Sequence, residues 1–153
     1  MVRVHDRAWK EAGRVVLRGT AMVGWSGLKR IEYWLRPDTG THGVLADDDP
    51  AWKDARWQPC AIAPPPKSWG GSLPEGVLPK DVWGFDPETG RPKEWPMRFC
   101  YALWTAALTG LKPGAYEFRV RTVDLNGYAQ PEPRPYPKSG RNEIQCRQFM
   151  VTE

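Results

Sequence analysis

Residues 111–131 read LKPGAYEFRVRTVDLNGYAQP, and this stretch predicts a β-strand enclosed by two turns. Pro113-Gly114 forms the first turn, and Asn126-Gly127 supplies the positive φ angles of the second. Between the turns apolar and charged side chains alternate: Tyr116, Phe118, Val120 and Thr122 on one face, and Glu117, Arg119 and Arg121 on the other. The pattern predicts one buried and one solvent-exposed face, which is typical of an antiparallel sheet in a sandwich.

Alternation of the same kind predicts further strands along the chain. The other predicted strands are Arg14–Val23, Ile31–Arg36, Arg56–Ile62, Met97–Leu108 and Asn142–Val151. With six or seven strands and no helix, we expect an all-β, immunoglobulin-like antiparallel β-sandwich. Residues expected in its core include Trp34, Trp57, Cys60 and Trp104. Tyr116 is expected to be structural, either as a tyrosine-corner residue bonded to backbone or as a core residue.

The composition indicates a single folded domain spanning residues 1–153. The hydrophobic content of 41% and the nine tryptophans argue against a disordered chain. No window approaches the roughly 18 apolar residues of a membrane span. Charged residues such as Arg3, Asp6 and Arg7 replace the apolar core of a secretory signal. The location depends on the parent protein, periplasmic if that protein carries a signal and cytoplasmic otherwise.

The formal net charge of +4 comes from basic residues scattered along the chain. Nucleic-acid-binding proteins concentrate basic residues on a patch and interleave aromatic residues for stacking. Here the basic residues alternate with apolar ones along predicted strands. The distribution therefore argues against a nucleic-acid partner.

The segment 59–96 differs from the rest, because it contains nine prolines and three tryptophans. So many prolines exclude a central strand or a helix, whereas a floppy linker normally lacks tryptophan. We therefore expect a long insertion packed onto the sandwich surface, and such loops often mark interfaces. Trp69, Trp83 and Trp95 are the expected interface residues, with a protein partner favoured over a saccharide.

Residues that carry catalysis are scarce. No Gly-x-Ser-x-Gly elbow or phosphate-binding glycine loop occurs, and His5 and His42 are expected to be solvated. Asp47-Asp48-Asp49 is expected to be a solvated acidic loop rather than a calcium site. Cys60, Cys100 and Cys146 form no Cys-x-x-Cys pair, so inert buried thiols are expected, with a Cys100–Cys146 pairing as the alternative.

Several segments, in order, resemble the dimerisation domain of molybdenum-cofactor oxidoreductases, the C-terminal domain of sulfite oxidases and their relatives. These segments are Gly19–Gly27, Ile31–Leu35, Trp57–Ala61, Tyr101–Trp104, Arg119–Asp124, Asn126-Gly127 and Gln130-Pro131. Two regions depart from the family pattern, namely Arg134–Asn142 and the long 59–96 insertion.

The resemblance implies a non-catalytic, immunoglobulin-like domain that pairs two subunits of a sulfite-oxidase-like enzyme. Its partners would be a second copy, the molybdopterin domain of the same protein, or both. The molybdopterin and its cysteine ligand would belong to a separate upstream domain, so no metal, cofactor or catalytic role falls to Cys60, Cys100 or Cys146. The alternative is a fibronectin-III-like adhesion or carbohydrate-binding module, since such modules share the Leu111-x-Pro113-Gly114-x-Tyr116 pattern.

Overall fold

The computed structural model describes residues 2–4, 9–11, 14–38, 51, 55–67, 69, 81–130 and 144–152, with the backbone alone for 2–4 and 9–11. The strands are β1 (Val2–Val4), β2 (Trp9–Glu11), β3 (Arg14–Ala21), β4 (Leu28–Pro37), β5 (Gln58–Pro59), β6 (Ala61–Ile62), β7 (Ala102–Leu108), β8 (Gly114–Asp124) and β9 (Gln145–Val151). The predictions for His5, His42, Asp47–Asp49 and Arg134–Asn142 fall outside the described residues. In the described part of the chain, no helix is long and apolar enough to cross a membrane.

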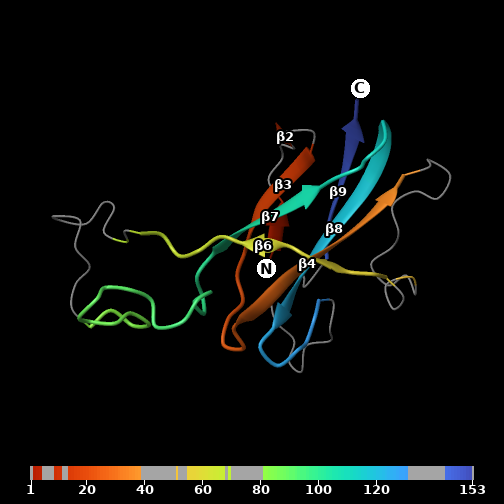
Figure 1. The fold of residues 1–153 in the computed structure, drawn as a ribbon. Coiled ribbons are helices and arrows are strands. Elements are labelled where there is room, and N and C mark those ends of the chain that lie inside the picture. Colours follow the sequence, from red (N-terminus) through yellow and green to blue (C-terminus); the bar gives the residue numbers. More distant parts are fainter. Residues whose placement is uncertain are drawn as a thin grey trace.

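The strands form two antiparallel sheets, which confirms the predicted all-β sandwich. The first, here called the β7 sheet, has the order β1-β3-β7-β6, with β2 also paired to β3. The second, the β8 sheet, has the order β5-β4-β8-β9 (Figure 1). Side chains of both sheets contribute to one hydrophobic core cluster. The core lies between the sheets.

An aromatic stack joins the sheets at the centre of this core. The ring of Phe118 on β8 stacks on Tyr33 of β4 at 5.6 Å and on Trp104 of β7 at 6.2 Å. Phe118 and Trp104 are 0% and 1% exposed. The prediction that Trp104 is a core residue is therefore confirmed, and the apolar face predicted for 116–122 does face the core.

The predicted strand Arg56–Ile62 is two strands in two sheets. Gln58–Pro59 pairs with β4, whereas Ala61–Ile62 pairs with β7. Cys60 stands between them, buried in the core, and its N–H donates to the carbonyl of Ile31 at 2.8 Å. A single residue therefore carries the chain from one sheet to the other. The insertion consequently begins after Ile62 rather than at Pro59.

The start of the chain and the turn after β8 differ from what the sequence predicts. The short strands β1 and β2 were not expected, and at three residues each they are too short to show alternation. At the turn after β8, Gly127 has φ 93°, but Asn126 does not have positive φ. The turn therefore differs from the two-residue type I′ turn, which needs positive φ at both central residues.

The charged face predicted for β8 is not solvent-exposed. Glu117 and Arg119 are both 0% exposed, although they point away from the sandwich core. Trp34 and Trp57 are also not core residues. Trp34 lies opposite Arg119 in the β4–β8 register, and Trp57 lies against Arg121, so both tryptophans belong to the outer face of the β8 sheet.

Tyr116 ties the start of β8 to the loop before it. Its hydroxyl donates to the carbonyl of Lys112 and accepts from the Lys112 N–H, both at 3.1 Å. The side chain is nearly buried and stacks on Phe149 at 5.6 Å. The predicted bonding of this hydroxyl to upstream backbone is therefore confirmed.

We expect Tyr116→Phe to destabilise the domain by about 1 kcal/mol, because both backbone groups of Lys112 lose their partner. For a chain of this size, the loss corresponds to about 3 °C in thermal unfolding followed by circular dichroism. Tyr101→Phe is the matched control, because Tyr101 is half-exposed. Equal melting temperatures for the two variants would contradict the assignment.

Candidate interaction surface

The outer face of the β8 sheet carries charged side chains that the strand register brings into pairs. On β4 and β8, Glu32 lies opposite Arg121, Trp34 opposite Arg119, and Arg36 opposite Glu117. Directly opposite residues on one face of an antiparallel pair have Cβ atoms about 5 Å apart. Opposite charges therefore meet across the two strands at both ends of this row.

Glu117 is the centre of the first ion cluster. Its Oε1 accepts from Arg119 Nε at 2.6 Å, and its Oε2 accepts from Arg36 Nε at 2.7 Å. The Cys146 thiol donates to Glu117 Oε1 at 3.6 Å. Since the side chains of Glu117 and Arg119 are 1% and 0% exposed, their charges are removed from water and need this pairing.

Glu32 is the centre of the second cluster. It accepts from Arg30 Nε at 2.6 Å and from Arg121 Nε at 2.9 Å, and the Arg121 guanidinium lies 4.1 Å from the centre of the Trp57 ring. Burial alone would raise the pKa of Glu32. The hydrogen bonds and charges of the two arginines outweigh burial and hold that pKa below its ordinary value. This face is thus an internally paired polar layer.

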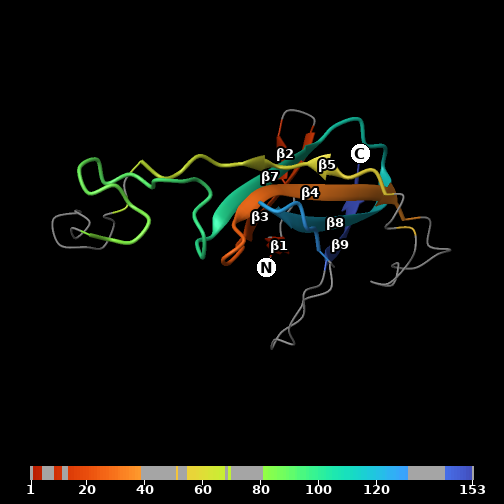
Figure 2. The same ribbon diagram turned by 90° about the horizontal axis from the view of Figure 1, so that it is seen from below.

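The insertion leaves the sandwich as a projecting arm, defined here as residues 63–67, 69 and 81–96. In Figures 1 and 2 the arm extends away from both sheets, with the green segment 81–93 at its far end. The prediction that the insertion packs onto the sandwich surface therefore holds for Trp95, which packs against the core, but not for segment 81–93, which extends away from it. The arm carries its own small aromatic cluster instead.

That cluster consists of three rings in edge-to-face contact. Trp69 lies 5.0 Å from Phe85 and 5.9 Å from Trp95, measured between ring centroids. The Trp95 indole N–H donates to the carbonyl of Ala63 at 2.8 Å, which joins the two ends of the arm. Edge-to-face pairs add stabilisation beyond the burial of ring area.

Beyond the cluster, the arm closes in a tight turn that starts at Asp86. Phe85 pairs with Pro92, and the Asp86 N–H donates to the carbonyl of Arg91 at 2.8 Å. The Asp86 carboxylate accepts from the Thr89 N–H at 2.8 Å and from the Thr89 hydroxyl at 3.0 Å. The hydrogen bonds from Thr89, that of its backbone N–H foremost, hold the pKa of Asp86 below its ordinary value. The arm is thus an ordered structural unit.

The three tryptophans predicted as interface residues have different places in the arm. Trp69 and Trp95 are half-buried in the aromatic cluster, so they build the arm itself. Trp83 is 62% exposed. Exposed tryptophans of this kind serve as anchors when a partner buries them. Of the three, Trp83 is the side chain that a partner can reach.

The cysteines have separate environments, and each carries a free thiol, so Cys100 and Cys146 are not bonded to each other. Burial, with a smaller contribution from the Glu32 charge, raises the pKa of Cys60 to about 12. A raised pKa keeps this thiol protonated at neutral pH, in agreement with the buried, inert cysteine that the sequence predicts. Among the described residues, no group of three or more His, Cys, Asp or Glu side chains could hold a metal ion.

No protein-family model and no curated protein matches this chain. The resemblance to the dimerisation domain therefore rests on the quoted sequence segments and their order.

We expect Glu117→Gln to lower the free energy of unfolding by about 3 kcal/mol, because the buried Arg119 and the part-buried Arg36 then face a neutral group. Urea denaturation measures the change. The control is Glu88→Gln, an exposed carboxylate on the arm, for which we expect less than about 0.5 kcal/mol. A loss as small as that of the control would show that Glu117 is not the centre of a buried ion cluster.

We expect the stability difference between the wild type and Glu32→Gln to depend on pH. The pKa of Glu32 is lower in the folded state than its ordinary value of 4.5. Its stabilising contribution is therefore complete above that value and is lost as the pH falls through the folded-state pKa. Urea denaturation of both proteins, from neutral pH to well below 4.5, tests this. A gap that stays constant with pH would contradict it.

Proposed function

We propose that this chain is a non-catalytic assembly domain of a molybdenum-dependent oxidoreductase resembling sulfite oxidases, and that it pairs two copies of the parent protein. The exposed Trp83 on the projecting arm is the observation that carries the assembly role. A tryptophan side chain left in water lacks roughly 2 kcal/mol of the stabilisation that burial provides. A partner that covers the side chain would supply this stabilisation. Trp95 joins the base of the arm to the core cluster, whereas Trp83 stays exposed and available to a partner.

The segments that carry the resemblance also lie together in the fold, which supports the family assignment. Trp34 pairs with Arg119, Gly19 with Trp104, and Cys60 donates to Ile31. Trp57 contacts Arg121 by a cation–π interaction. Residues of five quoted segments thus contact one another on or beside β3, β4, β7 and β8. Such contacts make the packing of each segment depend on the others.

Gln130, in the quoted segment Gln130-Pro131 after the β8 turn, has a structural role. Its side-chain oxygen accepts from the N–H and the hydroxyl of Thr122, both at 3.0 Å, and Gln130 is 6% exposed. The residue fastens the chain to β8 where the strand ends. Its place in the quoted pattern therefore has a physical reason, independent of any catalytic role.

Under this proposal the molybdopterin is bound by a different domain of the parent protein. It would supply the redox chemistry there, and no step of that chemistry passes through the residues described here. The contribution of this chain is to bring two such domains into one particle.

A second candidate function is a fibronectin-III-like adhesion or carbohydrate-binding module. An exposed indole such as Trp83 stacks on sugar faces as well as on protein. Saccharide titration followed by tryptophan fluorescence separates the two functions. A saturable change that Trp83→Ala abolishes would favour the carbohydrate function, whereas no change would leave assembly as the better account.

We expect the purified chain to form dimers in a concentration-dependent manner. Sedimentation equilibrium over a concentration series, at moderate and at high salt, measures the monomer–dimer constant. Apolar burial predicts that the constant changes little with salt, whereas association driven by ion pairs would weaken. A strict monomer at the highest concentration would overturn the proposed function.

A further inference from the structure

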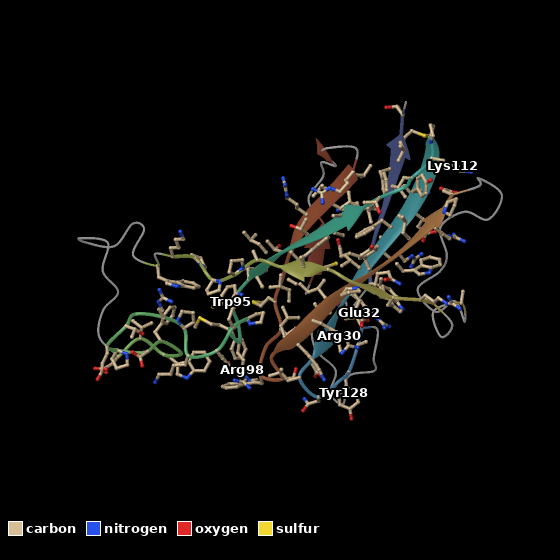
Figure 3. All side chains as sticks on the ribbon, viewed as in Figure 1. Arg30, Glu32, Trp95, Arg98, Lys112 and Tyr128 are labelled. Atoms are coloured by element: carbon tan, nitrogen blue, oxygen red, sulfur yellow. The ribbon has the colours of Figure 1, made fainter. Side chains whose placement is uncertain are left out.

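The turn after β8 contains an asparagine followed directly by a glycine, Asn126-Gly127. Both residues are exposed, and a Cβ atom at Gly127 would meet no other atom within 4 Å. Figure 3 places Tyr128, the next residue, at the end of the sandwich opposite to Lys112, which lies before β8. Water and hydroxide therefore reach this pair of residues.

An asparagine in this position can lose its side-chain amide without an enzyme. The Gly127 backbone nitrogen gives its proton to hydroxide and attacks Asn126 Cγ, which forms a five-membered succinimide ring. The Cγ–Nδ2 bond breaks, and Nδ2 leaves as ammonia with a proton drawn from water. A water molecule then opens the ring at either carbonyl and yields aspartate or isoaspartate. The net change is hydrolysis of an amide to a carboxylate and ammonia, without oxidation or reduction.

The backbone of the turn requires the residue that makes Asn126 reactive. Glycine has no Cβ atom to hinder the attacking nitrogen and has the most permissive backbone. Gly127 has φ 93°, in the left-handed region that other residues rarely adopt. A larger residue at this position would slow ring closure but would strain the turn. The fold therefore keeps the reactive pair.

Asp124 binds both groups that the reaction must move. Its carbonyl accepts from the Gly127 N–H at 3.0 Å, and its Oδ2 accepts from Asn126 Nδ2 at 3.5 Å. The Gly127 nitrogen is the nucleophile, and Nδ2 belongs to the leaving group. Ring closure therefore requires the Gly127 N–H to leave the Asp124 carbonyl and the Asn126 amide to turn away from the carboxylate.

Asp124 also closes the turn as a whole. Its N–H donates to the carbonyl of Tyr128 at 2.9 Å, and the Tyr128 N–H donates to Asp124 Oδ1 at 2.9 Å. Val123 pairs with Ala129 on the strand side of these bonds. An exposed turn reacts through its locally opened state, whose population falls as more bonds hold the turn closed. The bonds of Asp124 thus oppose succinimide formation.

We propose that Asn126 is the deamidation site of this chain and that Asp124 slows the reaction in the folded protein. The inference goes beyond the proposed assembly function and does not depend on it. The only other asparagine of the chain, Asn142, precedes Glu143, whose side chain hinders the attacking nitrogen. The two asparagines therefore differ in the residue that decides the intrinsic rate.

Deamidation at this turn would affect the end of β8. Isoaspartate adds a carbon atom to the backbone, so the turn no longer spans the distance set by the pairing of Val123 with Ala129. The next bond along the chain, from the Gln130 N–H to the Thr122 carbonyl at 3.1 Å, depends on that pairing. Since β8 lies between β4 and β9, the modification loosens a central strand of its sheet.

Peptide mapping tests the site. The full chain is incubated at neutral pH, folded or in urea, and mass spectrometry of tryptic peptides follows the exchange of –NH2 for –OH. Trypsin separates the two asparagines, because Lys138 and Arg141 lie between them. In urea we expect Asn126 to react at least about tenfold faster than Asn142. Equal rates would overturn the assignment of the site.

The folded wild type tests the protection. We expect Asn126 to react at least about fivefold more slowly in the folded chain than in urea, because the turn must first open. A folded chain that reacts as fast as the unfolded one would show that the turn gives no protection. This comparison uses the wild type alone, so it does not depend on the folding of any variant.

Substitution of Asp124 tests its role. We expect folded Asp124→Ala to react at Asn126 at least about threefold faster than the folded wild type, since both carboxylate bonds are lost, and equally fast in urea. Leu125→Ala is the matched control, because Leu125 is exposed in the same turn and its side chain makes none of these bonds. Asp124→Ala that reacts no faster than this control would refute the role of Asp124.

Circular dichroism shows whether Asp124→Ala is folded. If it is not, hydrogen exchange of the Gly127 amide in the wild type decides. We expect that exchange to be at least about fivefold slower in the folded chain than in urea, because the Asp124 carbonyl holds the N–H. Exchange at the unfolded rate would refute the protection by Asp124.

Discussion

The stacking of Phe118 between Tyr33 and Trp104 is the interaction on which the rest of the structure depends. It joins the two sheets, since Trp104 belongs to β7 and the other two rings to β4 and β8. Because side chains alternate along a strand, placing Phe118 inside sends Glu117 and Arg119 to the other face. The register that brings Tyr33 to the stack also sets Arg36 opposite Glu117. The core and the ion clusters therefore depend on the same register.

The outer face of the β8 sheet shows that a charged row need not be a solvated one. Glu117 and Glu32 each accept from two arginines, so every described carboxylate of this row is compensated. Breaking one partner strands the others away from water, which makes such a cluster sensitive to single substitutions. The charged side chains of this face therefore stabilise the domain. We place the surface for a partner on another part of the molecule.

The arm offers such a surface at the exposed Trp83, while Trp95 at its base packs against the core of the sandwich. The arm has its own aromatic cluster and turn bonds, so it keeps its shape while projecting into solvent. Phe99 combines a positive φ of 60° with a side chain that is 46% exposed. Under the proposed assembly role, a partner would bury Trp83. The sulfite-oxidase-like context remains the proposal that the sequence segments support.

Local patterns in the sequence determined the long strands and the apolar face of residues 116–122, because alternation and turn residues act over a few positions. They also offered backbone bonding as one of two roles for Tyr116. The sequence also singled out Trp69, Trp83 and Trp95 as a group. Only the tertiary structure decided that Cys60 carries the chain between sheets, that Trp34 and Trp57 lie outside the core, and that Glu117 is buried. It likewise separated the exposed Trp83 from its two half-buried neighbours. A side chain is buried when other residues cover the face on which it lies. Those residues are distant in the chain, so no local pattern in the sequence predicts them.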